Sequence, residues 1–226
     1  MVNTSILVLS CDKNRDLFCP FHYCMEKYWP NHPEIYYTTE SVKNEYYKTI
    51  NVNYSVEEWT RRIRETLLQI NTKFVLIMVD DLFLQSPVNT TKIDSLVRYM
   101  SLDVVNINFE PSFDAEDKKI WGIDLLQRNP KGAFLNSVMC GLWNREFFIK
   151  ALSKPKNPWD FELEPGLDNC RYLITKNGDY LNWGYKKDPE RADWHFGLHR
   201  GKWEKSCVEF LSHEGLWIDY SIRGII

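Results

Sequence analysis

Apolar positions repeat with two different periods along the first half of the chain, and the two patterns alternate. Short runs rich in apolar, β-branched and aromatic residues predict strands over 5–10, 35–39, 74–79 and 104–109. Apolar residues at helical spacing predict amphipathic helices over about 18–29, over 56–70 and from about residue 90. The order strand, helix, strand therefore recurs up to about residue 110.

The helix over 56–70 is the most clearly marked element. Ser55 and Glu58 form a capping-box sequence at its start. Apolar residues then follow at helical spacing: Val56, Trp59, Ile63, Leu67 and Ile70. The next element, FVLIMV over 74–79, has no polar position, which is typical of a strand covered on both faces in a parallel sheet.

Alternating strands and helices predict an α/β fold with right-handed βαβ units and a mostly parallel sheet flanked by helices. In such sheets ligands bind outside the carboxyl ends of the strands. Beyond residue 111 the pattern loosens, with one more predicted helix over 135–152 and then a loop-rich tail. We expect a single domain over 1–226, with a ligand-binding half over 1–110 and a second half over 111–226.

Two adjacent aspartates, Asp80 and Asp81, follow the most apolar strand. Neighbouring carboxylates at a buried strand end repel each other and lose hydration, which is costly unless a cation or several hydrogen-bond donors offset it. Mg²⁺ and Mn²⁺ prefer carboxylate oxygens and leave positions open for phosphate oxygens. The pair therefore predicts a metal and diphosphate site, and the alternative is that the two aspartates only cap or turn the chain.

Composition limits the classes of function. With 44% hydrophobic and 26% charged residues the chain is typical of a globular protein, and a net charge of −3 gives no general attraction to a polyanion. No apolar run is long enough to span a bilayer. The six cysteines accompany no export signal, so we expect reduced thiols and a cytoplasmic protein, or one peripheral to a membrane.

Three stretches together resemble small bacterial and phage glycosyltransferases of the GT-A type, and the resemblance covers most of the chain. They are SILVLSCDKNRDL, FVLIMVDDLFL with its preceding helix, and LNSVMCGLWNREFFIKAL followed by NPWDFELEPG. The resemblance implies a Rossmann-like GT-A sheet, a nucleotide-sugar donor bound by the first half, and an acceptor bound by the second. Val79, Asp80 and Asp81 occupy the place of the family's DxD motif, with Val in the first acidic position.

The same resemblance implies roles for several residues. Asp81 would ligate Mn²⁺ or Mg²⁺, with Asp80 assisting as a ligand or through the ribose or a bound water. The loop of Ser10, Cys11 and Asp12 would lie against the base and ribose of the donor, joined by Thr39. For Asp12 the alternative is a solvated loop position.

Two arginines on the helix over 56–70 are candidates for the diphosphate, because guanidinium groups pair bidentately with phosphate oxygens. Arg61 is the predicted contact, Arg62 is a second candidate, and a solvated helix face is the expected place of at least one of them.

An acidic stretch, PWDFELEPG, holds Asp160, Glu162 and Glu164. If it is extended, these three side chains share one face and the aromatic residues the other. A sugar transfer with inversion needs a carboxylate that takes the proton of the acceptor hydroxyl, and burial beside aromatic rings raises a carboxyl pKa toward a useful value. Glu162 is the first candidate for this base and Asp160 the second; the alternative is a solvated turn or a helix cap.

The tail segment ADWHFGLHRGKW carries His195, His199, Arg200 and Lys202. HFGLH lacks the Glu of HExxH, which argues against a zinc hydrolase. By resemblance to GT-A enzymes, His199 or else His195 would complete the metal shell. Arg200 and Lys202 would offset the charge of the leaving diphosphate. The alternative is a basic surface loop.

The resemblance thus implies a glycosyltransferase that uses a nucleoside-diphosphate sugar, with UDP-sugars favoured, and the carboxylates and cations favour a metal-assisted transfer with inversion. The acceptor would be a surface glycan, as in polysaccharide biosynthesis, a lipid-linked saccharide, or a modified base in phage DNA. The alternatives are a metal-dependent nucleotidyltransferase or phosphohydrolase, and a non-catalytic module that binds carbohydrate or nucleic acid. Neither G-x-G-x-x-G nor a P-loop is present to favour the first alternative.

Overall fold

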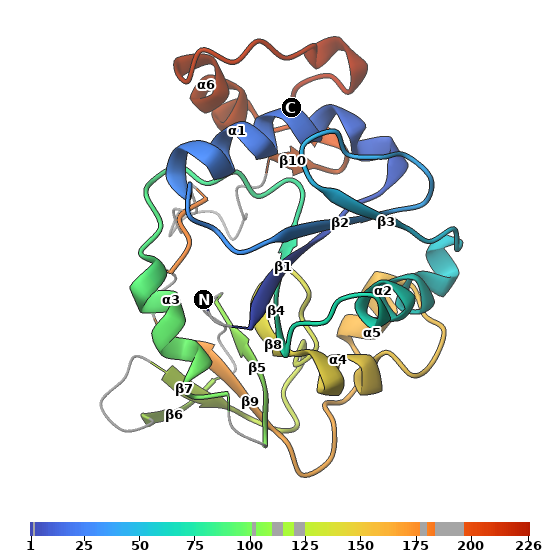
Figure 1. Cartoon of the computed structure of the whole chain (residues 1–226), viewed down its shortest axis with the longest axis vertical. Helices are drawn as coiled ribbons and strands as arrows, with labels where there is room; N and C mark the ends of the chain where they lie inside the picture. The colour runs from blue at the N-terminus through green and yellow to red at the C-terminus, as the bar shows by residue number, and fades with distance from the viewer. Residues whose placement is uncertain (2, 101–102, 110–114, 120–124, 177–179, 184–196) are drawn as a thin grey trace.

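A nine-stranded mixed sheet runs through the computed structural model, which describes residues 1, 3–100, 103–109, 115–119, 125–176, 180–183 and 197–226 (Figure 1). The strand order is β3-β2-β1-β4-β8-β5-β9-β7-β6. The strands are β1 (Thr4–Leu9), β2 (Ile35–Thr39), β3 (Lys48–Asn51), β4 (Phe74–Val79), β5 (Val104–Asn108), β6 (Ala115–Lys119), β7 (Leu125–Arg128), β8 (Cys140–Asn144) and β9 (Arg171–Thr175).

The strands β3, β2, β1 and β4 are parallel and form one side of this sheet, whereas β8 runs antiparallel to both β4 and β5. Leu9 pairs with Thr38 of β2 and with Val79 of β4, so the carboxyl ends of these three strands lie level with one another. The loops that follow β1, β2 and β4 therefore leave the sheet at the same edge.

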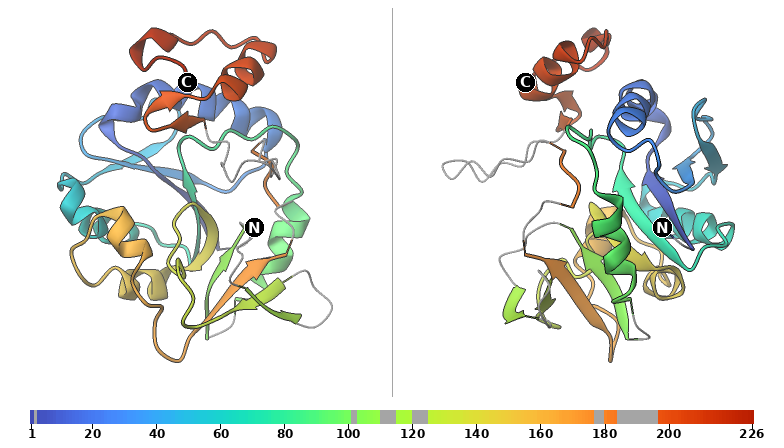
Figure 2. Two further views of the ribbon diagram at one scale, coloured as in Figure 1. Left: turned by 180° about the vertical axis from the view of Figure 1, so that it is seen from behind. Right: turned by 60° about the vertical axis from the view of Figure 1, so that its left-hand side comes forward.

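Helices cover both faces of the sheet, as Figures 1 and 2 show. Ile6 and Val8 of β1 pack into a core with α1, α3 and α6, while Leu7 and Leu9 pack into a second core with α2, α4 and α5. This alternation explains why β1 and β4 are apolar at nearly every position. The helices are α1 (Phe18–Tyr28), α2 (Trp59–Leu68), α3 (Thr90–Val97), α4 (Arg145–Ala151), α5 (Pro158–Glu162) and α6 (Lys205–His213).

The α/β fold class is confirmed, with the predicted strands and helices of the first half in their expected places. The start of the helix over 56–70 differs in detail. Val56–Glu58 form a 3-10 turn (η2) before α2, and the Ser55 side chain makes no capping hydrogen bond. The short strand β3 was not predicted, because it is only half-buried and carries little hydrophobic pattern.

The helix predicted over 135–152 is wrong in its first half. Cys140–Asn144 forms the buried strand β8, and α4 begins only at Arg145, with the Asn144 side chain accepting a hydrogen bond from the Glu146 N–H. The backbone of β5 passes so close that a Cβ on Gly141 would lie 3.1 Å from the Ile107 carbonyl oxygen. A glycine required by close strand packing was the local sign against a helix.

The last described segment, 197–226, forms a small unit beside α1 (Figure 2). It contains the hairpin of β10 (Leu198–His199) and β11 (Lys202–Trp203), then α6, and the 3-10 turn η3 (Tyr220–Ile222). Trp203 is fully buried, stacks on Phe83 at 6.0 Å between ring centroids, and pairs with Ile225 through a β-bridge. The C-terminus is thereby tied to the loop that follows β4.

Candidate functional site

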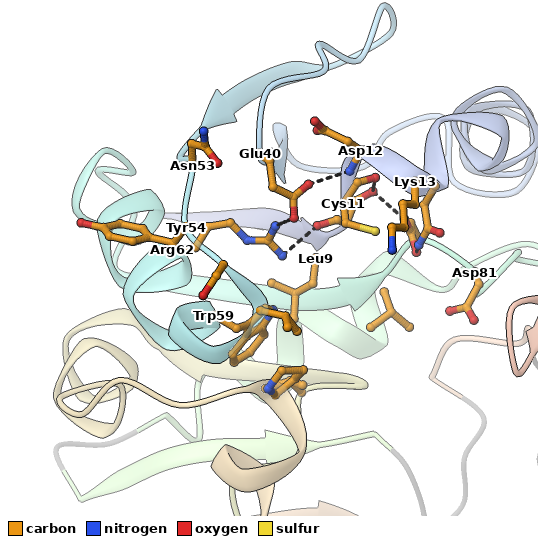
Figure 3. A pocket seen from close by; sticks show the side chains of 18 of the residues that line it. Leu9, Cys11, Asp12, Lys13, Glu40, Asn53, Tyr54, Trp59, Arg62 and Asp81 are labelled. Atoms are coloured by element: carbon orange, nitrogen blue, oxygen red, sulfur yellow. Dashed lines mark hydrogen bonds and ion pairs between the residues drawn. The ribbon is translucent and has the colours of Figure 1, made fainter.

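A pocket of about 950 Å³ opens at the carboxyl ends of β1, β2 and β4 (Figure 3). Its walls come from the loops after these strands, from the start of α2 and from the start of α5. The lining residues are Leu9, Ser10, Cys11, Asp12, Lys13, Asn14, Glu40, Asn53, Tyr54, Ser55, Val56, Trp59, Arg62, Val79, Asp80, Asp81, Val138, Pro158 and Trp159. The pocket therefore lies where a parallel sheet is expected to bind a ligand.

Asp80 lines the pocket and is only 3% exposed. Both of its carboxylate oxygens accept hydrogen bonds: the Ser10 hydroxyl donates to Oδ2 at 2.5 Å and Asn14 Nδ2 donates to Oδ1 at 3.1 Å. Burial, followed by the charge of Asp81, raises the pKa of Asp80 to about 7 despite these donors. Asp80 thus fastens the loop after β1 to the end of β4.

Asp81 is half-buried and has fewer side-chain partners. Burial is the main cause that raises its pKa to about 6, and hydrogen bonds from its own backbone N–H and that of Leu198 act against the rise. The Gly197 N–H also donates to the Asp81 carbonyl oxygen at 2.8 Å. The C-terminal unit therefore contacts Asp81 directly, at a place where a Cβ on Gly197 would lie 2.7 Å from that oxygen.

Arg223, which no sequence pattern indicated, connects the C-terminal unit to Asp80. Its guanidinium pairs bidentately with Asp16 at 2.7 and 2.6 Å and donates to the Lys13 carbonyl oxygen at 2.6 Å and to Asn14 Oδ1 at 3.0 Å. Asn14 in turn donates to Asp80. The positive charge also lowers the pKa of Asp80 and of Asp81, so Arg223 offsets part of the repulsion between them.

Arg62, rather than Arg61, lines the pocket. Arg62 is 6% exposed, pairs with Glu40 and donates to the Ser10 carbonyl oxygen at 3.1 Å, while Glu40 accepts the Asp12 N–H at 2.7 Å. Arg61 has a 52% exposed side chain, pairs with Glu58 and does not line the pocket.

The spacing along α2 could have separated these two arginines. Arg62 lies three residues after Trp59 and four before Thr66, both buried, and so falls on the apolar face of the helix, whereas Arg61 does not.

The loop after β1 lines the pocket from Ser10 to Asp12, whereas Thr39 does not line it. Burial acts to raise the pKa of Asp12, but hydrogen bonds from Ser41 and Val42 bring it down to about 2. Burial and the charge of Asp80 raise the pKa of the Cys11 thiol. Thr39 is fully buried, and its hydroxyl donates to the Val42 carbonyl oxygen at 2.6 Å, so it shapes the loop after β2.

The acidic stretch PWDFELEPG does not extend as a strand, so its three carboxylates do not share a strand face. Pro158–Glu162 forms α5, with the Asn157 side chain accepting from the Asp160 N–H and donating to the Asp160 carboxylate. Glu162 accepts the Val138 N–H at 3.0 Å, and burial raises its pKa. Among the described residues, α5 contributes Pro158 and Trp159 to the pocket, and neither Glu162 nor Asp160 lines it.

The basic residues of the tail lie on the β10–β11 hairpin. Arg200 and Lys202 are exposed and do not line the pocket, and Arg200 adopts a positive φ of 50° in the turn. His199 is half-buried, and its Nδ1 lies 3.9 Å from Glu204 Oε1. His195 lies outside the described residues. Within the described part of the chain no group of three His, Cys, Asp or Glu side chains is arranged to hold a metal ion.

No protein-family model matches the sequence, and no curated protein matches it. Among solved structures, the chain resembles bifunctional IspDF from Campylobacter jejuni (14% identity, 75% of this chain and 51% of that one, TM-score 0.42). It also resembles S. aureus TarS 1–349 (9% identity, 79% of this chain and 59% of that one, TM-score 0.45). A third similar structure is galactosyltransferase LgtC in complex with donor and acceptor sugar analogues (11% identity, 65% of this chain and 59% of that one, TM-score 0.41).

The chain spans about half to three fifths of the length of these three chains. At such identities and TM-scores, the likeness does not extend to what this chain binds or does.

Proposed function

We propose that this protein is a glycosyltransferase that moves a sugar from a nucleoside-diphosphate sugar, with a UDP-sugar favoured, to an acceptor hydroxyl. One observation carries the proposal: Asp80 and Asp81 both line the pocket at the carboxyl ends of β1, β2 and β4. An acidic pair of one buried and one half-buried carboxylate beside a cavity of this size suits a ligand that brings cations or hydrogen-bond donors with it. The identity of the reaction follows from the resemblance of the sequence to GT-A enzymes.

The donor would lie along the loop after β1. The base and ribose would face Ser10, Cys11 and Asp12. Tyr54 also lines the pocket. Arg62 would act through its contacts with Glu40 and with the Ser10 carbonyl oxygen, by keeping this loop in place.

A Mn²⁺ or Mg²⁺ ion fits Asp81 better than Asp80, because both oxygens of Asp80 are engaged by Ser10 and Asn14. Asp81 would hold the ion, with Asp80 as a hydrogen-bonded support and phosphate oxygens as further ligands. When bound, such an ion would supply positive charge to the leaving diphosphate. The predicted third ligand, His199, belongs to the hairpin that contacts Asp81 through Gly197 and Leu198.

The transfer would proceed by direct displacement. The acceptor oxygen forms a bond to the anomeric carbon, the bond from that carbon to the diphosphate oxygen breaks, and the hydroxyl proton passes to a carboxylate. Glu162 and Asp160 are the candidates for this base from the sequence, but neither lines the pocket, where α5 presents Trp159 instead, so neither is assigned the role. Trp159 is 67% exposed and offers an aromatic surface on which a sugar of the acceptor could stack.

The acceptor is proposed as a surface glycan, a lipid-linked saccharide or a modified base in phage DNA. Among the described residues, no helix has the length and apolar character needed to cross a bilayer. Retention on DNA that falls steeply with salt would favour the DNA acceptor, because contacts with phosphates release counterions.

A donor-hydrolysis screen with UDP-, GDP- and CDP-sugars in the presence of Mn²⁺ tests the proposal. We expect release of the nucleoside diphosphate from one of these donors. Turnover of nucleoside triphosphates with release of pyrophosphate would instead identify a nucleotidyltransferase. A folded protein that binds and turns over none of the donors would refute the proposed function.

The Asp81→Ala variant separates an enzyme from a non-catalytic binding module. We expect UDP binding that is strengthened by Mn²⁺ in the unchanged protein and insensitive to Mn²⁺ in the variant. Asp168→Ala, at an exposed position away from the pocket, is the matched control. A sugar-binding module would bind its ligand equally well in all three proteins.

A further inference from the structure

Six formally charged side chains line the pocket: Asp12, Lys13, Glu40, Arg62, Asp80 and Asp81. Most of them are already engaged within the protein. Arg62 and Glu40 pair with each other, the Asp12 carboxylate accepts hydrogen bonds from Ser41 and Val42, and Asp80 accepts from Ser10 and Asn14. These four side chains are held in the wall of the pocket by contacts within the protein.

Lys13 differs from the others. Its side chain is exposed, and it makes no hydrogen bond or ion pair with any residue that the structure describes. Figure 3 shows Lys13 at the edge of the pocket, between Cys11 and Asp81. An ammonium group at that place could reach a ligand without first breaking a contact inside the protein.

The backbone of Lys13 is held firmly although its side chain is not. Its carbonyl oxygen accepts the 2.6 Å hydrogen bond from Arg223, and the neighbouring Asn14 is fixed between Arg223 and Asp80. The loop therefore needs little reordering when a ligand arrives, which lowers the entropic cost of binding.

We propose that Lys13 contacts the diphosphate of the bound nucleotide, on the opposite side from Asp81. This inference rests on the proposed function and adds to it a phosphate-binding residue that the sequence analysis did not single out. Lysine commonly binds phosphate as a point charge. The half-buried Asp81, and Lys13, which is unpaired among the described residues, give the pocket one anion for a metal ion and one cation for phosphate oxygens.

Other cations of the chain are less suited to this contact. Arg223 uses its guanidinium on Asp16, Lys13 and Asn14, and Arg62 uses its own on Glu40 and Ser10. Arg200 and Lys202, the residues predicted for this role, lie on the exposed hairpin outside the pocket lining.

The test compares uridine, UMP and UDP binding to the unchanged protein, to Lys13→Gln and to Lys13→Arg, by calorimetric titration at low salt. UDP, GDP and CDP are screened first, and the nucleoside series follows the preferred base. We expect Lys13→Gln to weaken diphosphate binding by about 10-fold or more, since a hydrogen bond to a charged group contributes roughly 1.5–3 kcal/mol. Binding of the nucleoside alone should not change, and Lys13→Arg should retain most of the affinity.

Lys131→Gln is the matched control, since Lys131 is also exposed and does not line the pocket. Unchanged diphosphate binding by Lys13→Gln, or an equal loss for uridine and UDP, would overturn the role of Lys13 and leave the proposed function standing. If the unchanged protein binds none of the nucleoside diphosphates, the proposed function fails, and this inference fails with it.

Discussion

Asp80 and Asp81 are contacted by an N-terminal and a C-terminal region of the molecule, and these two regions are built in different ways. The N-terminal side is a wall made by β1, β2 and α2, in which Arg62 and Glu40 are enclosed next to a continuous hydrophobic core. The C-terminal side is the unit 197–226, which reaches the same place through Arg223 and through the backbone at Gly197 and Leu198. The sheet thus places the negative charges of Asp80 and Asp81 side by side, which is costly. Arg223, from a segment distant in the sequence, offsets part of this repulsion.

The sharpest way to break the N-terminal wall is Arg62→Ala. The change leaves Glu40 without its partner at a partly buried position and removes the donor to the Ser10 carbonyl oxygen. We expect a loss of about 3 kcal/mol in the free energy of unfolding, measured by urea denaturation. Arg61→Ala, which removes an exposed pair with Glu58, should cost less than about 1 kcal/mol. Equal losses for both variants would contradict the account of the wall.

Arg223→Gln tests the C-terminal side. It removes the partner of Asp16 and the donors to the Lys13 carbonyl oxygen and Asn14 Oδ1. We expect a loss of about 2 kcal/mol in unfolding free energy. We also expect weaker UDP binding, because the loop after β1 is no longer held.

Arg200→Gln, in the exposed turn, is the control for this change and should alter neither quantity. If Arg223→Gln lowers stability but leaves UDP affinity unchanged, the C-terminal unit supports the fold and not the pocket.

The pH dependence of stability reports on the pair itself. Burial raises the pKa values of Asp80 and Asp81 from 3.8 to about 7 and about 6, so the folded protein holds protons that the unfolded chain has released. The resulting stabilisation is complete below pH 3.8 and is lost as pH rises through the folded-state values.

Without divalent ions, the contribution of this pair to the melting temperature should therefore decrease between about pH 4 and 7. In Asp80→Asn this decrease should be smaller. A melting temperature that rises over this interval in the unchanged protein, and equally in Asp80→Asn, would contradict the assignment.

The smallest expected effect on stability comes from Trp159→Ala at the rim. Trp159 is 67% exposed, so we expect the free energy of unfolding to change by less than about 0.5 kcal/mol. In a transfer assay the variant should raise the KM for the acceptor and leave donor binding unchanged. Trp217→Ala, at an 87% exposed position outside the pocket lining, serves as the control. A loss of UDP affinity would instead place Trp159 on the donor side.

The N-terminal region could be predicted from the sequence because its signals are local. An unbroken apolar run specified β4, and helical spacing specified α2, although the prediction chose Arg61 whereas Arg62 lies on the buried face. The acidic pair and the loop of Ser10, Cys11 and Asp12, which the sequence places at strand ends, line the pocket, and their binding roles stay predictions.

The C-terminal region could not be predicted in this way, because its contacts join residues far apart in the sequence. The pairing of Arg223 with Asp16 spans 207 positions, and nothing in the local sequence SIRGII marks it. A helix was predicted over residues 140–144, which form the strand β8, because burial between β4 and β5 overrides their local preference in the folded protein. For Asp160 and Glu162, the helix begun by Asn157 and Pro158 changed which side chain meets the pocket.

A crystal structure of the protein with UDP and Mn²⁺ would show where a diphosphate binds relative to the acidic pair. We expect density for the diphosphate in the pocket beside β1 and β4, with the metal ion on Asp81 and the Lys13 ammonium within hydrogen-bond distance of a phosphate oxygen. Nucleotide bound elsewhere, with the Asp80–Asp81 pocket empty in the same crystal, would contradict this expectation.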